Sequence, residues 1–587
     1  MGETVIDVLT GTAERMPEVP AFAVRQDGGW ESTSWRAYRE LVFSVARGLI
    51  ALGLSPGAGV GILSFNRPEW FLAYLGAMAA GGLPTGIYET NPAEECAYII
   101  AHAEVGVVVV EDEEQLDKIL SVRHRLPKLE AIVLLEGDPT SPETLTWSEL
   151  LDLGMQASEE LAARLAALRD DSPATLIYTS GTTGAPKAVA LSHSNLVWTA
   201  HRVREAYGIA PGETVLSYLP LSHIAEQIVS LHVPMAAAAC TCFAESLDRL
   251  RENLCEVRPH LFFAVPRVWE KMQAAIEDAG RSAPRFKRSL AAWARRKGLA
   301  QARAAQSGGR RPVAAGLAKR LVFEPVRRRL GLDRARICAT STAPIAVETL
   351  EFFASLGIVI LEVYGMSECT GPATFSFAER FRFGKAGFSI PGTEIALAED
   401  GEILIRGPHV FLGYFKDEDA THGALDGEGW LHSGDVGDID EDGFLAITDR
   451  KKDLIITAGG KNVAPQKLEG LLRGLPGISQ AVVVGDRQRF IAALLTLDPG
   501  AVEHVASEAG SPAKTVEEAI HCSRFRAYIE SRVGEVNRRL ARSEQVRRFA
   551  FLSRELSIES GELTPSQKIR RKVVQERQRE VIESLYA

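Results

Sequence analysis

Residues 178–187 read YTSGTTGAPK, and this stretch sets the interpretation of the whole chain. It follows an apolar run, ATLI at 174–177, and combines five hydroxyl side chains and two glycines with one lysine. Such a loop offers backbone N–H groups, short hydroxyl donors and an ammonium, all of which bind phosphate oxygens. The nucleotide triphosphatase loop is different, because four residues separate its glycines and Lys-Ser/Thr follows directly. We predict a polyphosphate-binding loop; the alternative is a surface turn without a ligand.

Short apolar runs rich in β-branched residues precede this loop and other polar motifs. They lie at 60–65, 105–110, 131–135, 214–218 and 358–364. Fully apolar runs of this length are typical of strands that helices cover on both faces. In open α/β sheets, ligands bind just beyond the carboxyl ends of such strands. The pattern therefore predicts a helix-covered sheet with its ligand site near the polar motifs.

The loop belongs to a series of motifs in a fixed order. The others are YLPLSHIAEQ (218–227), AVPRVWEKM (264–272), VYGMSE (363–368), GEILIRGP (401–408), GWLHSGD (429–435), TDRKKDLIITAGGKNVAP (448–465) and LTPSQKIRRKVV (563–574). Together they resemble the AMP-forming adenylating enzymes, which include acyl-CoA synthetases, luciferases and peptide-synthetase adenylation domains. Three of the motifs look most like long-chain fatty acyl-CoA synthetases, and GIYETNPAEECAYI (86–99) resembles the bubblegum-type branch of that family.

The chain is too long for one core, since domains usually hold about 100–200 residues. From about 384 to 448, short strands alternate with Gly-rich turns. We expect an α/β fold, with a large N-terminal region of helix-covered sheets, a small β-rich subdomain and a smaller, mobile α+β C-terminal domain. The expected boundaries are an adenylate-forming domain over 1–448 (ATP, magnesium and acyl sites), a hinge segment over 449–462, and a C-terminal domain over 463–587 with the catalytic lysine.

The resemblance implies an ATP site assembled from several motifs. The loop residues would wrap the β- and γ-phosphates, and they are Thr179, Ser180, Gly181, Thr182, Thr183 and Gly184. Lys187 would neutralise phosphate charge and counts among the catalytic residues. In VYGMSE, Tyr364 would stack on adenine, Gly365 would belong to the same site, and Ser367 would reach the α-phosphate in place of the more usual Thr.

The ribose and magnesium contacts are also implied by the resemblance. Asp435 would hold both ribose hydroxyls, since a carboxylate accepts two hydrogen bonds, and Arg450 would add a second ribose contact. The alternative for Asp435 is a turn aspartate after a glycine. Glu368 matches the family's magnesium ligand and, with the Thr179 hydroxyl, suits Mg²⁺, which keeps waters and phosphate oxygens as ligands. The alternative for Glu368 is an ordinary surface acid.

Lys568 matches the C-terminal catalytic lysine, whose ammonium would bridge the attacking carboxylate and the α-phosphate. The sequence departs from the commonest form of the motif, because Gln567 stands where Gly is usual. The neighbours Arg570, Arg571 and Lys572 leave the register open by a few positions, and an exposed basic helix start is the alternative.

Three further residues carry roles that only the resemblance implies. His223 would help to orient the substrate carboxylate, although a lone histidine is also often structural. Lys452 would be the hinge about which the C-terminal part rotates for the second step. Trp269 would be the aromatic gate of the acyl tunnel, with a core anchor as the alternative. In TSTAPI (340–345), where relatives usually carry a Gly/Ala-rich sequence, Ser341 and Thr342 are larger and polar, so we expect local differences in the positioning of adenine or of the acyl group.

We predict a long-chain fatty acid:CoA ligase (AMP-forming) that uses ATP, CoA and Mg²⁺ and passes through an acyl-adenylate. Such chemistry needs cations, N–H donors and a metal placed in advance, because a carboxylate must approach a polyphosphate. The alternatives are a ligase for aromatic acids or for a carrier protein, a non-catalytic acyl- or nucleotide-binding relative, and a phosphotransferase.

Composition narrows the partners and the compartment. The formal net charge of −10 argues against nucleic-acid binding, and seven cysteines without a CxxC pair predict free thiols and a reducing compartment. The N-terminus lacks the features of a signal peptide, so we expect a cytoplasmic protein. Residues 281–336 carry seventeen Lys or Arg against two acids. This segment is either a solvated insertion or an amphipathic patch in peripheral contact with an anionic membrane.

Overall fold

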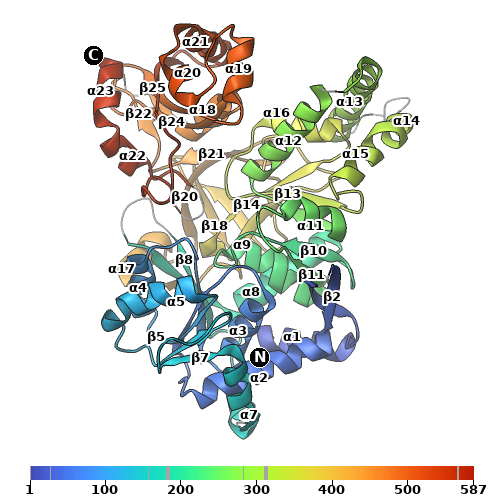
Figure 1. The fold of residues 1–587 in the computed structure, drawn as a ribbon, viewed down its shortest axis with the longest axis vertical. Helices are drawn as coiled ribbons and strands as arrows, with labels where there is room; N and C mark the ends of the chain where they lie inside the picture. Colours follow the sequence, from blue (N-terminus) through green and yellow to red (C-terminus); the bar gives the residue numbers. More distant parts are fainter. Residues whose placement is uncertain are drawn as a thin grey trace.

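The computed structural model describes residues 2–26, 28–156, 158–179, 185–281, 283–307, 309, 315–459, 461–564 and 568–587. It is a mixed α/β structure in which two large sheets with their helices form the N-terminal part, and a smaller domain lies at one end (Figure 1). The expected fold class is confirmed.

The first sheet contains the two strands before and after the predicted phosphate loop. Its strands, in spatial order, are β19 (Gly413–Tyr414), β9 (Lys187–Ser192), β8 (Pro173–Thr179), β4 (Leu83–Ile87), β3 (Gly59–Leu63), β5 (Val105–Val110), β6 (Ala131–Leu134) and β7 (Thr144–Thr146). The strands from β4 to β7 run parallel, whereas β8 and β9 pair antiparallel on the two sides of the loop. β3, β4 and β6 are buried at every residue, as predicted for doubly covered strands.

The alternation along β5 shows how helices cover both faces of this sheet. Val107 and Val109 face a core that includes α2 (Trp35–Ala51) and α3 (Pro68–Ala79). Val108 and Val110 face the opposite core, with α4 (Ala93–His102) and α5 (Glu113–Val122). Successive side chains of a strand point to opposite faces, so an unbroken apolar run is what a two-sided core requires.

The second sheet carries three of the motifs. Its strands, in spatial order, are β16 (Phe388–Ser389), β15 (Gly371–Phe375), β14 (Ile360–Met366), β13 (Ile337–Thr340), β12 (Leu261–Phe263), β10 (Thr214–Ser217), β11 (Cys240–Phe243), β1 (Pro20–Gln26) and β2 (Gly29–Ser34). YLPLSHIAEQ follows β10, AVPRVWEKM follows β12 and VYGMSE begins on β14. One face packs on α11 (Leu250–Val257), α12 (Pro266–Arg281) and α16 (Val347–Ser355). Compared with the predicted run at 358–364, β14 begins and ends two residues later, because the strand continues through VYGM and pairs with β15.

The β-rich subdomain is an antiparallel sheet, in line with the short strands and Gly-rich turns of the sequence. Its order is β17 (Glu394–Leu397), β18 (Glu402–Arg406), β20 (Leu431–Ile439) and β21 (Leu445–Arg450). Shorter helices complete the N-terminal part, and they are α1 (Val5–Arg15), α6 (Trp147–Leu153), α7 (Ser158–Ala167), α8 (His193–Tyr207), α9 (Ile224–Glu226), α10 (Val233–Ala237) and α17 (Glu418–Ala424).

The C-terminal part is built on a separate small sheet. β24 (Ile478–Val484), β25 (Ile491–Leu497) and β26 (Val546–Phe551) form it, with α18 (Pro465–Arg473), α19 (Val502–Glu508), α20 (Val516–His521) and α21 (Ser523–Asn537) on one face and α22 (Arg571–Arg577) and α23 (Arg579–Tyr586) on the other. The predicted hinge segment 449–462 holds the end of β21, a turn and a short hairpin of β22 (Ile455–Ile456) with β23 (Asn462–Val463).

The described residues of the basic segment 281–336 are mainly helical, and the residues after Arg329 are not. After α12 come α13 (Arg285–Gln306), α14 (Ala315–Ala318) and α15 (Glu324–Arg329), which lie beside α16 at the same end of the molecule as the C-terminal domain (Figure 1). Among the described helices, none is both long and apolar enough to cross a membrane. All seven cysteines are free thiols, as expected, and five of them are buried.

Candidate active site

A cavity of about 1690 Å³ lies between the second sheet, the helices α11 to α13 and the C-terminal domain. Its wall includes His223, Arg450 and Lys568, which the sequence placed in three separate motifs. The chain distance between the first and last of these residues is large, so only the folded structure brings them to one space. The cavity is the candidate active site.

His223 lies in the turn that follows β10 and begins α9. Its Nδ1 accepts a hydrogen bond from the Ala225 backbone N–H at 3.1 Å, and burial together with the nearby Lys568 charge lowers its pKa to about 3. The imidazole is therefore neutral at physiological pH, with Nδ1 as acceptor and the proton on Nε2. A neutral ring held in this tautomer can donate a hydrogen bond from Nε2 to a carboxylate in the cavity.

Asp435, Tyr364 and Arg450 form a bonded group at the predicted nucleotide site, and we call this part of the cavity the nucleotide side. The Tyr364 hydroxyl donates to Asp435 Oδ2 at 2.9 Å, and Arg450 Nε lies 3.3 Å from Asp435 Oδ1. The aspartate is only 6% exposed. Burial raises its pKa, and the Arg450 charge opposes that rise. β20 and β21 pair Asp435 directly with Arg450, so the sheet register itself fixes this contact.

Lys568 enters the cavity from a short loop of the C-terminal domain. The two ends of the loop bind each other, since the Thr564 N–H donates to the Lys568 carbonyl at 2.8 Å and the Lys568 N–H donates to Thr564 Oγ1 at 3.0 Å. The lysine side chain opens to the cavity, yet protein surrounds it. Burial and the Arg450 charge lower its pKa to about 8, while the charges of Asp435 and Glu368 act in the opposite direction. The C-terminal domain thus holds its lysine beside the nucleotide-side residues.

Glu368 and Lys187 lie on two sides of one aromatic residue, Tyr414. The Tyr414 hydroxyl donates to Glu368 Oε1 at 2.8 Å, and Lys187 Nζ lies 4.5 Å from the centre of the Tyr414 ring. Glu368 is 8% exposed, so it is no surface acid. Tyr414 thus contacts both a cation and an anion, and their roles toward phosphate and magnesium stay predictions.

Five predicted phosphate ligands, Ser180, Gly181, Thr182, Thr183 and Gly184, lie outside the described residues. Thr179 precedes them at the end of β8, where its hydroxyl lies 3.5 Å from the Lys187 carbonyl. β8 and β9 pair Thr179 with Lys187, so the strands hold the two ends of the loop together.

The remaining VYGMSE residues have clear structural constraints. A Cβ at Gly365 would meet the Gly371 carbonyl oxygen at 1.8 Å, so β14 and β15 require glycine there. Ser367 is 7% exposed and immediately precedes Glu368. Their contacts with a nucleotide stay predictions.

Trp269 and Lys452 lie in contrasting places. Trp269 is 0% exposed and packs edge-on against Phe262 and Phe353, while its Nε1–H donates to the Ala339 carbonyl at 3.4 Å. A fully buried side chain contributes no cavity surface, so Trp269 packs as a core anchor does. Its gating role stays a prediction. Lys452 is exposed in the turn after β21, at the junction of the two parts, and its hinge role also stays a prediction.

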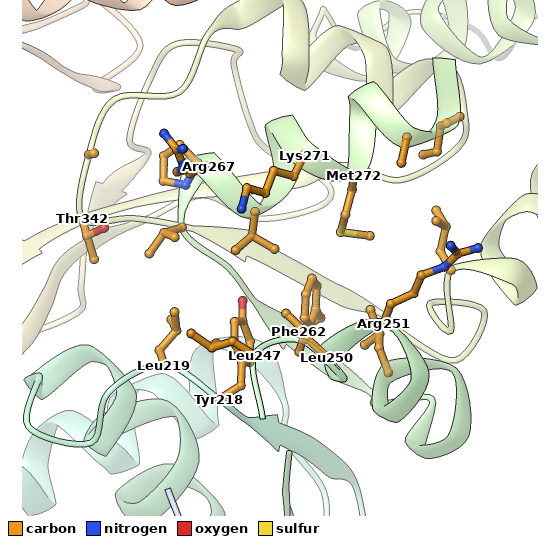
Figure 2. A pocket seen from close by; sticks show the side chains of 18 of the residues that line it. Tyr218, Leu219, Leu247, Leu250, Arg251, Phe262, Arg267, Lys271, Met272 and Thr342 are labelled. Carbon is orange, nitrogen blue, oxygen red and sulfur yellow. The ribbon is translucent and has the colours of Figure 1, made fainter. Parts of the chain in front are cut away.

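The far half of the cavity is mainly apolar. Figure 2 shows side chains from α12 facing those from the turn after β10, with Arg267, Lys271 and Met272 on one side and Tyr218 and Leu219 on the other. Further apolar lining comes from Leu250, Leu254, Phe262, Ile276, Val326, Leu330, Phe352 and Leu356. A long apolar slot that starts beside a polar site suits a ligand with one charged end and one hydrocarbon end.

Thr342 lines the cavity, and in Figure 2 it lies at the left end of the view, with Arg251 at the right end. Its φ is +74°, a conformation that favours glycine and is strained for a β-branched residue. The departure noted in TSTAPI therefore has a physical consequence, since a threonine is held where a glycine fits more easily.

Sequence reasoning missed Tyr414 completely. The residue lies on the short strand β19, which pairs with β9 so that Tyr414 lies beside Val189. No feature of the surrounding VFLGYFKD predicts that pairing, because it joins residues more than two hundred positions apart. The observed contact with both Lys187 and Glu368 makes Tyr414 part of the candidate site.

Comparison with known proteins gives consistent results. A model described as AMP-binding enzyme matches residues 9–415, and one described as AMP-binding enzyme C-terminal domain matches residues 452–587. The chain is 40% identical over 620 residues to a long-chain-fatty-acid–CoA ligase, ACSBG2, of Xenopus laevis (99% of this chain, 84% of that protein). It is 37% identical over 617 residues to ACSBG1 of Bos taurus, with the same description (99% and 85%).

Solved structures show the same fold at low identity. The anthranilate CoA ligase AuaEII in complex with anthranoyl-AMP gives a TM-score of 0.75 at 19% identity, covering 99% of this chain and 98% of that one. ATP-bound MatB from Rhodopseudomonas palustris gives 0.72 at 22% identity, covering 98% and 99%.

Proposed function

Because this chain belongs to the AMP-binding enzyme family, we propose that it is a long-chain fatty acid–CoA ligase that activates its substrate with ATP through an acyl-adenylate. The substrate class is that named for its full-length relatives. The observation that carries the proposal is the position of Lys568 and His223 in one cavity with the Asp435–Tyr364–Arg450 group on one side and an apolar slot on the other.

The side chains divide the first half-reaction between them. A fatty acid lies with its chain in the apolar slot and its carboxylate at His223 Nε2–H. ATP lies with its ribose at Asp435 and its phosphates at Lys187 and the loop after β8. The Lys568 ammonium stabilises the charge that develops as the carboxylate oxygen attacks the α-phosphorus and pyrophosphate leaves. Preorganised cations matter here because both reactants are anions.

Mg²⁺ fits the donors that these residues offer. In the described part of the chain, no group of three or more His, Cys, Asp or Glu is arranged to hold a metal. The Glu368 carboxylate and the Thr179 hydroxyl suit an ion that takes its other ligands from phosphate oxygens and water. When bound, Mg²⁺ would neutralise phosphate charge.

The second half-reaction needs CoA to reach the adenylate after Lys568 has left. We assign the required rotation to the turn at Lys452, where the C-terminal part begins. The thiol of CoA then attacks the acyl carbonyl and AMP leaves, which gives the acyl-CoA thioester. Hinges of this kind absorb backbone rotation at a few residues between domains.

The test of the activity is the identity of the nucleotide product. Incubation with ATP, palmitate and CoA should give palmitoyl-CoA, AMP and pyrophosphate in equal amounts. Release of ADP instead would place the protein among phosphotransferases. A series of acids from acetate to very long chains, with aromatic acids included, would show whether the apolar slot selects long chains.

The outer part of the cavity favours contact with an anionic membrane. Phe286 is 77% exposed, Leu247 59% and Leu321 48%, and all three line the cavity. The adjacent lining includes Lys287 and Arg288, which form no ion pair with any residue that the structure describes. Exposed apolar side chains among unpaired cations suit the interface of an anionic bilayer, where each cation contributes about 1 kcal/mol. Fatty acids partition into membranes, so this position would place the slot next to its substrate.

Co-sedimentation with vesicles tests the membrane contact. Wild-type protein should sediment with phosphatidylcholine vesicles that contain phosphatidylserine at low salt, and less so at high salt. The triple variant Phe286→Ala, Lys287→Gln and Arg288→Gln should lose most of this binding, while Arg487→Gln with Arg538→Gln, which removes two exposed cations elsewhere, should keep it. Absence of wild-type binding at low salt would remove the proposal and leave a solvated insertion.

A further inference from the structure

The segment GIYETNPAEECAYI (86–99) has no role in the chemistry above, yet it touches both catalytic elements. At its start, a Cβ on Gly86 would lie 2.7 Å from Ser222 Cα, and the Tyr88 side chain lies near that of Ser222. Ser222 directly precedes His223. The beginning of the segment therefore packs against the turn that carries the histidine.

The other end of the segment reaches the C-terminal domain. Glu95, in the first turn of α4, forms an ion pair with Arg570 in which Arg570 Nη2 lies 3.2 Å from Glu95 Oε1. The side chains are only 28% and 22% exposed, so water screens the pair less than an ordinary surface pair. Arg570 lies two residues after Lys568, in the same loop.

Arg570 and its neighbour Arg571 bind opposite parts of the molecule. Arg571 Nη1 lies 2.6 Å from Glu469 Oε1 on α18 and donates to the Val483 carbonyl at 3.0 Å. Both of these partners belong to the C-terminal domain. Arg571 therefore fixes the loop to its own domain in any domain orientation, whereas Arg570 reaches Glu95 only when the domain lies as it does here.

Other contacts between the two parts are further from the lysine loop. Arg281 lies 2.7 Å from His504 Nε2, and Arg539 lies 3.4 Å from Glu348 with the side chains 74% and 60% exposed. Neither contact belongs to the segment that carries Lys568. Among the hydrogen bonds and ion pairs of the described residues, the Glu95–Arg570 pair is the one that joins the N-terminal part to the segment that carries Lys568.

We propose that Glu95 and Arg570 are positioning residues for the first half-reaction, whose ion pair docks the lysine loop on α4 and holds Lys568 at the adenylate site. The inference rests on the proposed function. Rotation of the C-terminal domain would pull Arg570 away from Glu95. The ion pair therefore favours the orientation for acyl-adenylate formation, and it is broken during thioester formation.

Separate assay of the two half-reactions tests the proposal. Glu95→Gln and Arg570→Gln should each lower the maximal rate of palmitate-dependent ATP–pyrophosphate exchange about fivefold, with little change in the KM for ATP or palmitate. Thioester formation from supplied palmitoyl-adenylate and CoA should stay at the wild-type rate. Arg570→Lys should retain part of the exchange rate, and the reversed pair Glu95→Arg with Arg570→Glu should recover more of it than either single reversal.

Glu94 provides the matched control. It is the preceding residue of the same helix turn, it pairs with Arg125 in the N-terminal part, and it is 73% exposed. Glu94→Gln should leave both half-reactions unchanged. An equal loss of both half-reactions in Glu95→Gln, or no loss of either, would overturn the proposal.

Hydrogen–deuterium exchange gives a readout that needs no activity. Glu95→Gln should raise hydrogen–deuterium exchange in α4 and also in the distant peptide that carries Lys568 and Arg570. Arg570→Gln should raise exchange in its own peptide and also in α4. Glu94→Gln should leave exchange in the distant peptide unchanged. Changes confined to the mutated segment would overturn the proposal. If the variants show these coupled changes but the wild-type protein catalyses no ATP–pyrophosphate exchange, the docking contact is supported and the proposed activity is refuted.

Discussion

The two halves of the cavity satisfy their polar groups in different ways. On the nucleotide side, Asp435 already binds Tyr364 and Arg450, and Glu368 already binds Tyr414, so the acceptors are aligned before a ligand arrives. On the acyl side, Arg267 and Lys271 project into an apolar slot and form no hydrogen bond or ion pair with the described residues.

This difference indicates that the proposed reaction depends on the nucleotide side of the cavity, whereas the acyl side can accept ligands of different shape. Donors and acceptors that are already in place need little rearrangement during the reaction, and they restrict a bound nucleotide to one geometry. An apolar wall with flexible cations at its edge accepts ligands by shape and length. Changes on the nucleotide side should therefore affect rate most, and changes elsewhere in the cavity wall should affect stability or selectivity.

The largest expected effect is that of Lys568→Ala, which would remove the moving cation from the nucleotide side. We expect adenylation, measured as palmitate-dependent ATP–pyrophosphate exchange, to fall by about 100- to 1000-fold, the usual cost of losing a preorganised charge-stabilising donor. Thioester formation from supplied acyl-adenylate should survive. Lys572→Ala, which changes an exposed lysine of the same motif, is the control. If both half-reactions of Lys568→Ala fall equally, the assigned role is wrong.

A smaller effect is expected when the bonded group itself is weakened. Asp435→Asn keeps the shape of the side chain but removes the charge that Arg450 and Tyr364 face. Hydrogen bonds to charged groups contribute about 1.5–3 kcal/mol, so the KM for ATP should rise about 10- to 100-fold while the KM for palmitate changes little. Asp400→Asn, in the same subdomain and 51% exposed, should leave both constants unchanged. A larger rise for palmitate than for ATP would contradict the assignment.

The pH profile of adenylation should report the lysine directly. The pKa of Lys568 is about 8, and the ammonium is the active form, so the rate should fall as pH rises through 8, by about tenfold between pH 7 and pH 9. Lys568→Arg should be slower but should lose this alkaline decline, because arginine keeps its proton in this range. An unchanged decline in Lys568→Arg would assign the titration to another group.

The smallest effect concerns Thr342, in the cavity wall. Replacement by glycine should relieve the strain of φ +74° and raise the unfolding free energy by about 0.5–1 kcal/mol, after the extra flexibility of glycine in the unfolded chain is subtracted. Thermal unfolding measures this change. Thr370→Gly is the contrasting variant: φ is +56°, but the Thr370 hydroxyl donates to the His409 carbonyl at 2.6 Å, so this substitution should destabilise the protein.

Local patterns were sufficient to predict much of the fold and several site positions. The run at 105–110 predicted a doubly covered strand because every residue in it is apolar, and β5 confirms it. The order of motifs predicted that His223 and Lys568 act at one site, and the cavity contains both. The sequence left open which basic residue of LTPSQKIRRKVV is the catalytic lysine. The contacts favour Lys568, because Arg570 and Arg571 form ion pairs elsewhere and Lys568 lies near Asp435 and Glu368.

Contacts between distant segments were not predictable in this way. Tyr414 reaches Lys187 and Glu368 only through the pairing of β19 with β9, and Glu95 meets Arg570 across 475 positions. Burial also decides cases that a motif leaves open, as for Trp269, whose indole is fully enclosed between two phenylalanines. Such features depend on how whole sheets and domains pack, which no short pattern encodes.

The ring of Tyr414 has one further consequence. Without the ring, the ammonium of Lys187 and the carboxylate of Glu368 would be free to form an ion pair with each other. The ring holds the ammonium over its face and the carboxylate at its hydroxyl edge, so it works as a spacer between opposite charges. The tyrosine therefore keeps a cation and an anion near each other, and these are the charges that the proposed function assigns to the phosphates and to the metal.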